Sequence, residues 1–225
     1  MNFSCQAILF DLDGVLVDST AAVERVWRRW AIEHELDADF VVKNAHGRRS
    51  IETIRQLAPT LDAERENEIV EGMEIADKDG VVAIAGAREL LLSLPKERFT
   101  IVTSATRALA QARLEFAGFA IPKRFIAADD VVNGKPSPEP YLKGAALLGI
   151  PPGDCIVFED TPAGIQAGLA AGMRTIAVRS TYPTEALTAA DATVGSLAEV
   201  AVDNNIEIEE LRIQISRSRF ASDSG

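Results

Sequence analysis

The segment Ala7-Ile-Leu-Phe-Asp-Leu-Asp-Gly14 decides the fold of this chain. It opens with a continuous apolar run, Ala7–Phe10, and two acidic residues, Asp11 and Asp13, follow that run directly. Continuous rather than alternating apolarity is typical of a strand that is covered on both faces, as in a parallel sheet between helices. The segment therefore predicts a buried strand that ends in two carboxylates.

Four later apolar runs have the same character, and helical stretches separate them. These runs are predicted to be strands and comprise Phe99–Val102, Phe125–Ala128, Cys155–Phe158 and Thr175–Val178. Helices are predicted over Arg107–Phe116 and Tyr141–Leu148, each stopped by a glycine, and from Pro162 onward. This alternation is typical of α/β proteins, so we predict a doubly wound parallel sheet.

Between the first and second predicted strands, the chain carries a helical pattern and no sheet pattern. Apolar residues recur there at helical spacing, and the longest such stripe comprises Val23, Val26, Trp27, Trp30 and Ala31. Two shorter stripes begin at Ile51 and Ile69. We therefore predict an α/β core formed by residues 1–16 and 86–225, with an α-helical cap inserted over residues 17–85.

Apolar residues near the C-terminus lie close to a strict alternation. They are Ile206, Ile208, Leu211, Ile213 and Ile215. This spacing predicts one or two strands at the edge of a sheet, whereas the polar residues 216–225 are expected to be mobile.

The composition bounds the class of protein. Of 225 residues, 47% are hydrophobic and 25% are charged, as in a soluble globular protein. Acidic residues outnumber basic ones by 34 to 23, and the net charge of −11 disfavours nucleic acid and anionic membranes as partners. The apolar runs are shorter than the roughly 20 residues of a membrane helix, and the N-terminus lacks the basic segment of a signal peptide. We expect a cytoplasmic protein with no membrane, nucleic-acid or obligate protein partner.

Polar groups of several chemical types follow the predicted strands. Asp11 and Asp13 follow the first strand, Thr103 and Ser104 the second, Lys135 lies in the loop after the third, and Glu159 and Asp160 close the fourth. In an open parallel sheet, ligands bind outside the carboxyl ends of the strands. Each motif alone has a simpler reading, as a turn, a helix cap or a solvated loop. The order of all four on successive strand ends is what those readings leave unexplained.

Such a cluster would suit phosphoryl transfer. Four neighbouring carboxylates repel one another unless a cation lies among them, and an all-oxygen site favours Mg²⁺. Asp11, directly after the strand, can attack phosphorus and form an aspartyl-phosphate. Asp13 can protonate the leaving alkoxide and later take a proton from water. Lys135 and Mg²⁺ would offset charge on the phosphoryl oxygens.

Four segments then resemble, in order and spacing, the four motifs of the haloacid dehalogenase-like superfamily. They are Asp11-Leu-Asp-Gly-Val-Leu-Val-Asp-Ser19, Val102-Thr-Ser-Ala105, Gly134-Lys-Pro-Ser-Pro138 and Phe158-Glu-Asp-Thr-Pro-Ala-Gly164. The resemblance implies a Rossmann-like core with a helical cap. Metal ligands by the same resemblance are Asp11, the backbone carbonyl of Asp13, Asp160, and Glu159 directly or through water. The hydroxyls of Thr103 and Ser104 would bind phosphate, and Asp13 favours phosphate chemistry because the superfamily's dehalogenases lack it.

The cap segment Ala45-His-Gly-Arg-Arg-Ser-Ile-Glu-Thr-Ile-Arg55 resembles that of phosphatases acting on small sugar and polyol phosphates, such as 2-deoxyglucose-6-phosphate, hexitol phosphates and glycerol phosphate. We expect a small phosphorylated metabolite as substrate, held by Arg49 as the cap closes. His46 and Arg48 receive no role. Which sugar or polyol is preferred stays open.

Two alternatives remain open. A β-phosphoglucomutase shares the cap and all four motifs, but the resemblance would require a histidine early in the first cap helix, and Ser19–Val26 contains none. A non-catalytic protein that binds a phosphorylated ligand is the alternative of another class. The second is disfavoured because both Asp11 and Asp13 are intact.

Overall fold

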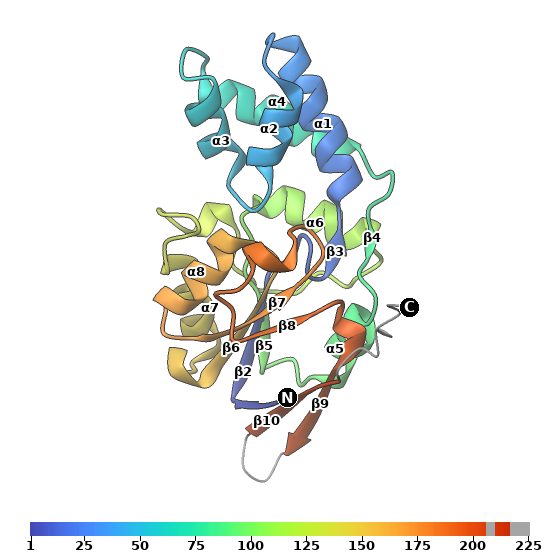
Figure 1. The fold of residues 1–225 in the computed structure, drawn as a ribbon, viewed down its shortest axis with the longest axis vertical. Coiled ribbons are helices and arrows are strands. Elements are labelled where there is room, and N and C mark those ends of the chain that lie inside the picture. Colours follow the sequence, from blue (N-terminus) through green and yellow to red (C-terminus); the bar gives the residue numbers. More distant parts are fainter. Residues whose placement is uncertain (206–209, 217–225) are drawn as a thin grey trace, which may run out of the picture.

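The centre of the molecule is a five-stranded parallel sheet, seen in a computed structural model that describes residues 1–205 and 210–216 (Figure 1). Its strand order is β5 (Phe99–Ile101), β2 (Ala7–Phe10), β6 (Cys155–Glu159), β7 (Arg174–Val178) and β8 (Ala192–Val194). Neighbouring strands are all parallel. The predicted α/β fold class is confirmed, and β8 is a strand that the sequence pattern did not predict.

Helices cover both faces of this sheet. Ile8 and Phe10 of β2 pack in one apolar cluster with α5 (Ala87–Ser93) and α6 (Arg107–Phe116). Ala7 and Leu9 pack in another, with α7 (Glu139–Leu148) and α8 (Pro162–Ala170). Successive side chains of a strand point to opposite faces, so a strand between two helical layers must be apolar at every position. The continuous run at the start of the chain has this cause.

The strand predicted over Phe125–Ala128 is wrong. Only Ile126 pairs with the sheet edge, as a single bridge to Val102. The next amide, of Ala127, donates to the Asp130 carboxylate at 2.8 Å, and the chain turns into the short helix η1 (Ala128–Asp130). The Ala128 amide is the next one that a parallel ladder would turn toward β5, but it donates to the Ala105 carbonyl at 2.9 Å. The pairing therefore stops after one residue. The loop that carries Lys135 therefore starts from a single bridge.

Four helices form a separate layer over the carboxyl ends of the strands (Figure 1). They are α1 (Thr20–Glu33), α2 (Ala38–Ala45), α3 (Ser50–Leu57) and α4 (Ala63–Ala76). Their shared core includes Trp27 and Trp30, as the helical stripe predicts, whereas Ile69 is 40% exposed and its neighbour Val70 is buried. The chain enters and leaves this layer through a two-stranded antiparallel pair, β3 (Val17–Asp18) and β4 (Val82–Ala83). We keep residues 17–85 as the proposed extent of the cap.

A small antiparallel sheet lies at the end of the molecule opposite the cap (Figure 1). Its order is β1 (Asn2–Cys5), β10 (Glu210–Ile215) and β9 (Val200–Asn205). Strand β10 confirms part of the predicted C-terminal pattern, while Ile206, Ile208 and residues 217–225 lie outside the described residues. Three further short helices are η2 (Pro152–Asp154), η3 (Thr184–Ala186) and η4 (Leu197–Glu199). Among the described helices, none has the length and apolarity to cross a membrane.

Candidate active site

The loop after β2 presents both aspartates of the first motif. The amide of Asp11 still donates to the Phe158 carbonyl of β6 at 3.0 Å, so Asp11 extends the buried strand. Gly14 then turns the chain with a φ of 77°. A Cβ at Gly14 would lie 2.0 Å from Oδ2 of Asp160, so only glycine lets the loop approach this carboxylate. The turn thereby packs the loop after β2 against the Asp160 carboxylate at the end of β6.

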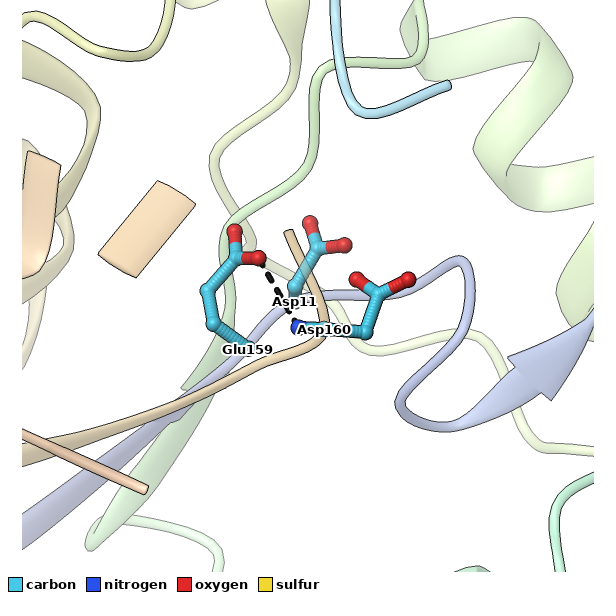
Figure 2. A group of neighbouring side chains, drawn as sticks. All are labelled: Asp11, Glu159 and Asp160. Atoms are coloured by element: carbon cyan, nitrogen blue, oxygen red, sulfur yellow. Dashed lines mark hydrogen bonds between the residues drawn. The ribbon is translucent and has the colours of Figure 1, made fainter. Parts of the chain in front are cut away.

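Three buried carboxylates meet at this point. Asp11, Glu159 and Asp160 each place one oxygen within 4.8 Å of the others, and Figure 2 shows the Asp11 carboxyl group between the other two. Burial raises the pKa of Asp11 from 3.8 to about 7; the Lys135 charge opposes this effect, and the Glu159 charge adds to it. Burial, followed by the charges of Glu159 and Asp11, raises the pKa of Asp160 well above its ordinary value. The fold thus concentrates three acidic side chains in a region that is shielded from bulk water.

This cluster has the features of a site for a hard divalent cation. Its donors are all oxygens, and Oδ1 of Asp160 is buried with no hydrogen-bond partner among the described residues. A buried polar atom without a partner is costly unless an ion or water satisfies it. A cation such as Mg²⁺ would satisfy that atom and relieve the repulsion that raises both pKa values. The residues present therefore fit the predicted metal.

Lys135 lies inside the same cluster. Its buried ammonium group donates to Oδ1 of Asp11 at 2.6 Å, to Oε1 of Glu159 at 2.7 Å and to the carbonyl of Val102 at 3.1 Å. Burial alone would lower the pKa of this lysine, but the two carboxylates raise it above its ordinary value. Lys135 therefore stays charged beside the predicted nucleophile.

Both carboxyl oxygens of Glu159 accept hydrogen bonds from neighbouring groups. Its Oε1 accepts from Lys135 and from the Tyr141 hydroxyl at 2.9 Å. Its Oε2 accepts at 3.0 Å from the amide of Asp160, drawn as the dashed line in Figure 2, and from the amide and hydroxyl of Thr161. In this arrangement Glu159 orients Lys135 and fixes the turn after β6. Its predicted contribution to the metal, direct or through water, stays a prediction.

Asp13 has a different set of partners. Its Oδ1 accepts from the Ser19 hydroxyl at 2.7 Å, and its Oδ2 accepts from Nη1 of Arg113 at 2.6 Å. Arg113 is buried in α6, and its Nη2 lies 3.2 Å from Oε1 of Glu74 in cap helix α4. Sequence reasoning did not single out Arg113 or Glu74. The available signal was a charged residue four positions after Leu109, on the apolar face of its helix.

Residues of the core and the cap together line a cavity of about 70 Å³ over the two aspartates. From the core, Thr103 and Ser104 line it together with Asp11, Asp13 and Asp160, and the predicted contact of the two hydroxyls with phosphate stays a prediction. From the cap, the lining residues include Trp27, His46, Arg48, Glu71 and Glu74.

The cap arginines are placed differently from one another. Arg49 does not line the cavity; its Nη1 donates to the carbonyl of Val132, in the loop before Lys135, at 3.1 Å. Arg48, which received no predicted role, lines the cavity and donates to Gln56 at 2.9 Å. The predicted contact between Arg49 and substrate stays a prediction.

Comparison with known proteins places this site in context. A family model described as haloacid dehalogenase-like hydrolase matches residues 5–172. Hexitol phosphatase A of Escherichia coli is 41% identical, covering 88% of this chain and 94% of the relative. Glycerol-1-phosphate phosphohydrolase 2 of Saccharomyces cerevisiae is 37% identical, covering 81% of this chain and 78% of the relative. The crystal structure of a β-phosphoglucomutase from Clostridium difficile has a TM-score of 0.75 at 24% identity, covers 91% of this chain and 95% of that chain, and shows a shared fold.

Proposed function

This chain belongs to the haloacid dehalogenase-like hydrolases, and from that premise we propose that it is a Mg²⁺-dependent phosphatase of small sugar or polyol phosphate monoesters. The observation that carries the proposal is the buried Asp11 carboxylate, 2.6 Å from the Lys135 ammonium group at the floor of a cavity closed by the cap. A nucleophile beside a fixed positive charge, out of bulk water, suits attack on a phosphoryl group.

In the first step, an oxygen of Asp11 attacks phosphorus and the ester oxygen leaves. An aspartyl-phosphate forms, and Asp13 gives the departing alkoxide a proton. Lys135 offsets charge on the phosphoryl oxygens, and the hydroxyls of Thr103 and Ser104 bind them. In the second step, Asp13 takes a proton from a water molecule as that water attacks phosphorus, which frees Asp11 and releases phosphate.

Mg²⁺ would be held by the carboxylates of Asp11 and Asp160, the carbonyl of Asp13, and Glu159 directly or through water. When bound, it supplies positive charge that neutralises the phosphoryl group and lowers repulsion between that group and Asp11. The buried Oδ1 of Asp160, which has no hydrogen-bond partner within residues 1–205 and 210–216, supports this assignment.

The size of the cavity supports a moving cap. About 70 Å³ holds roughly five water molecules, since each needs on the order of 10–15 Å³ of such space. A sugar phosphate therefore reaches Asp11 only if the cap opens. We propose hinges at the two crossings, near Val15–Ser19 and Val82–Gly86, where β3 pairs with β4.

The proposed class of substrate is inferred from the names of the relatives. Two of them are named for hexitol phosphate and glycerol-1-phosphate, and each aligns with most of this chain. A cavity lined by Arg48, Glu71 and Glu74 offers the charged groups that bind hydroxyls. We therefore favour a small sugar or polyol as the alcohol part of the ester.

Phosphate release across a panel of sugar, polyol and nucleotide phosphates tests the proposal, run with Mg²⁺, with EDTA and with Asp11→Asn as the blank. Mg²⁺-dependent release concentrated on hexose or polyol phosphates is expected. Interconversion of glucose phosphates without release would favour the mutase alternative. Binding of phosphorylated ligands with neither reaction would favour the non-catalytic one.

A further inference from the structure

Asp13 lies in the turn beyond the end of β2, in an isolated bridge to Val17. An aspartate side chain has two rotatable bonds, and a proton transfer requires its carboxyl group within hydrogen-bond reach of the reacting oxygen. In this structure both oxygens of Asp13 are held, one by Ser19 at 2.7 Å and the other by Arg113 at 2.6 Å. What holds those partners therefore decides where the Asp13 carboxyl group points.

Arg113 is itself held by the cap. Its guanidinium group comes from core helix α6 and is buried, with Nη1 on Asp13 and Nη2 3.2 Å from Glu74 of α4. Glu74 is also buried, and burial raises its pKa while the charge of Arg113 opposes that rise. A second contact joins the same two helices, in which the Thr106 hydroxyl donates to Glu71. If the cap opens, Glu74 leaves with α4 and Arg113 loses one of its two carboxylate partners.

We propose that Arg113 is a positioning residue for the acid–base group Asp13, and that Glu74 fixes Arg113 only while the cap is closed. The guanidinium group has a planar fork of donors, so it can hold two carboxylates in a fixed relation in a way that a single ammonium group cannot. Closure of the cap would then complete the alignment of Asp13 as it shuts water out of the cavity. This inference rests on the proposed phosphatase function.

The leaving group provides the test. An alkoxide leaves only if it is protonated, whereas p-nitrophenolate is a weak base and leaves without a proton. A residue that acts through Asp13 must therefore matter for an alkyl phosphate and much less for p-nitrophenyl phosphate. The ratio kcat/KM covers the steps up to departure of the alcohol, so the later hydrolysis of the phospho-enzyme, common to both esters, does not enter.

We would measure kcat/KM with Mg²⁺ for glycerol phosphate and for p-nitrophenyl phosphate in the wild type, Arg113→Gln and Glu74→Gln. Arg113→Gln is expected to lower the value for glycerol phosphate about 100-fold and that for the aryl ester less than about tenfold. Glu74→Gln is expected to lower the alkyl value about tenfold with little effect on the aryl one. Arg55→Gln, which breaks an exposed ion pair to Glu64 within the cap, is the control and should change neither value.

Equal losses on both esters in the two variants would overturn the inference, because they would indicate a purely structural role. Wild-type values for both esters in both variants would overturn it as well. If Arg113→Gln does not fold, as judged by circular dichroism, Glu74→Gln decides the question alone, since it removes a charge with almost no change of volume. A wild type inactive on every ester would overturn the proposed function itself, which separates that failure from this one.

Discussion

Asp11 and Asp13 lie two residues apart, yet the fold gives their carboxyl groups different surroundings. Asp11 continues a buried strand and contacts Lys135, whereas Asp13 lies past the strand and contacts Ser19 and Arg113. The first is fixed by backbone pairing and the second by side chains that come partly from the cap. A fixed group suits a nucleophile, and a group set by closure suits proton transfer to whatever substrate has entered.

Replacement of the nucleophile should separate activity from folding. Asp11→Asn keeps the volume and one acceptor for Lys135, so we expect a native circular dichroism spectrum and a loss of turnover of at least about 1000-fold. The measurement is phosphate release from the best ester of the panel, beside a thermal melt. A rate near that of the wild type would refute the assignment of Asp11 as nucleophile.

Lys135 should matter to stability as well as to chemistry. It is the buried positive charge between Asp11 and Glu159, at 2.6 and 2.7 Å. Removing one partner of a buried ion pair typically costs about 3–5 kcal/mol, so Lys135→Met should lower the free energy of unfolding by roughly that amount. Urea unfolding measures it in EDTA at neutral pH. The double variant with Glu159→Gln should recover part of the loss, and no recovery would contradict the assignment of the cost to unpaired charge.

At the scale of elements, the strands that are best predicted from the sequence are those with a local pattern of apolar residues. The strands β2, β6 and β7 follow from continuous apolar runs because a strand covered on both faces has no polar side to show. The run at Phe125–Ala128 has the same pattern but makes only one bridge, because the Ala128 amide donates to the Ala105 carbonyl and the chain turns into η1. The apolar pattern of the run does not predict this contact with a residue more than 20 positions away.

The residues of the site likewise separate into those that a sequence pattern predicts and those that it does not. Asp11, Asp13, Lys135, Glu159 and Asp160 were predictable because the carboxyl ends of parallel strands share one edge, and the structure brings them together. Arg113 was not, because its contact with Asp13 spans 100 residues and depends on how α6 packs beside the loop after β2. Arg48 and Arg49 are adjacent in sequence, and only the backbone before α3 decides that Arg48 lines the cavity.

The loop between α2 and α3 is the element on which closure can be tested. A Cβ at Gly47, where φ is 75°, would lie 2.5 Å from Cγ2 of Thr161 in the core. Gly47→Ala should therefore keep the cap from closing fully and lower kcat/KM about tenfold or more. Gly149→Ala is the matched control, because its φ is 71° but nothing in the described part of the chain lies within 4 Å of the added carbon. Both should lose about 1–2 kcal/mol of stability from the strained backbone. Equal activity in the two variants would argue against a role for this contact in closure.

At the scale of the whole molecule, the buried carboxylates of the site destabilise the folded state when they are charged, and the proposed cation would relieve this effect. In metal-free protein, the pKa of Asp11 is raised by burial from 3.8 to about 7, and that of Asp160 is raised as well. Between these limits the folded state binds more protons than the unfolded state. These two groups therefore favour folding most below about pH 4, and that contribution is lost as the pH rises through about 7.

Mg²⁺ should reverse this trend because it takes the place of the protons. We expect the increase in Tm on adding Mg²⁺, relative to EDTA, to be small at about pH 5 and larger at about pH 8, where both buried carboxylates must otherwise be charged without the ion. A difference of 1 kcal/mol would appear as about 2–4 °C in a chain of this size. Comparing each pH with and without the ion cancels the titration of all other groups. Asp160→Asn should remove most of the pH dependence, and an Mg²⁺ effect that was equal at both pH values in the wild type would contradict binding at these carboxylates.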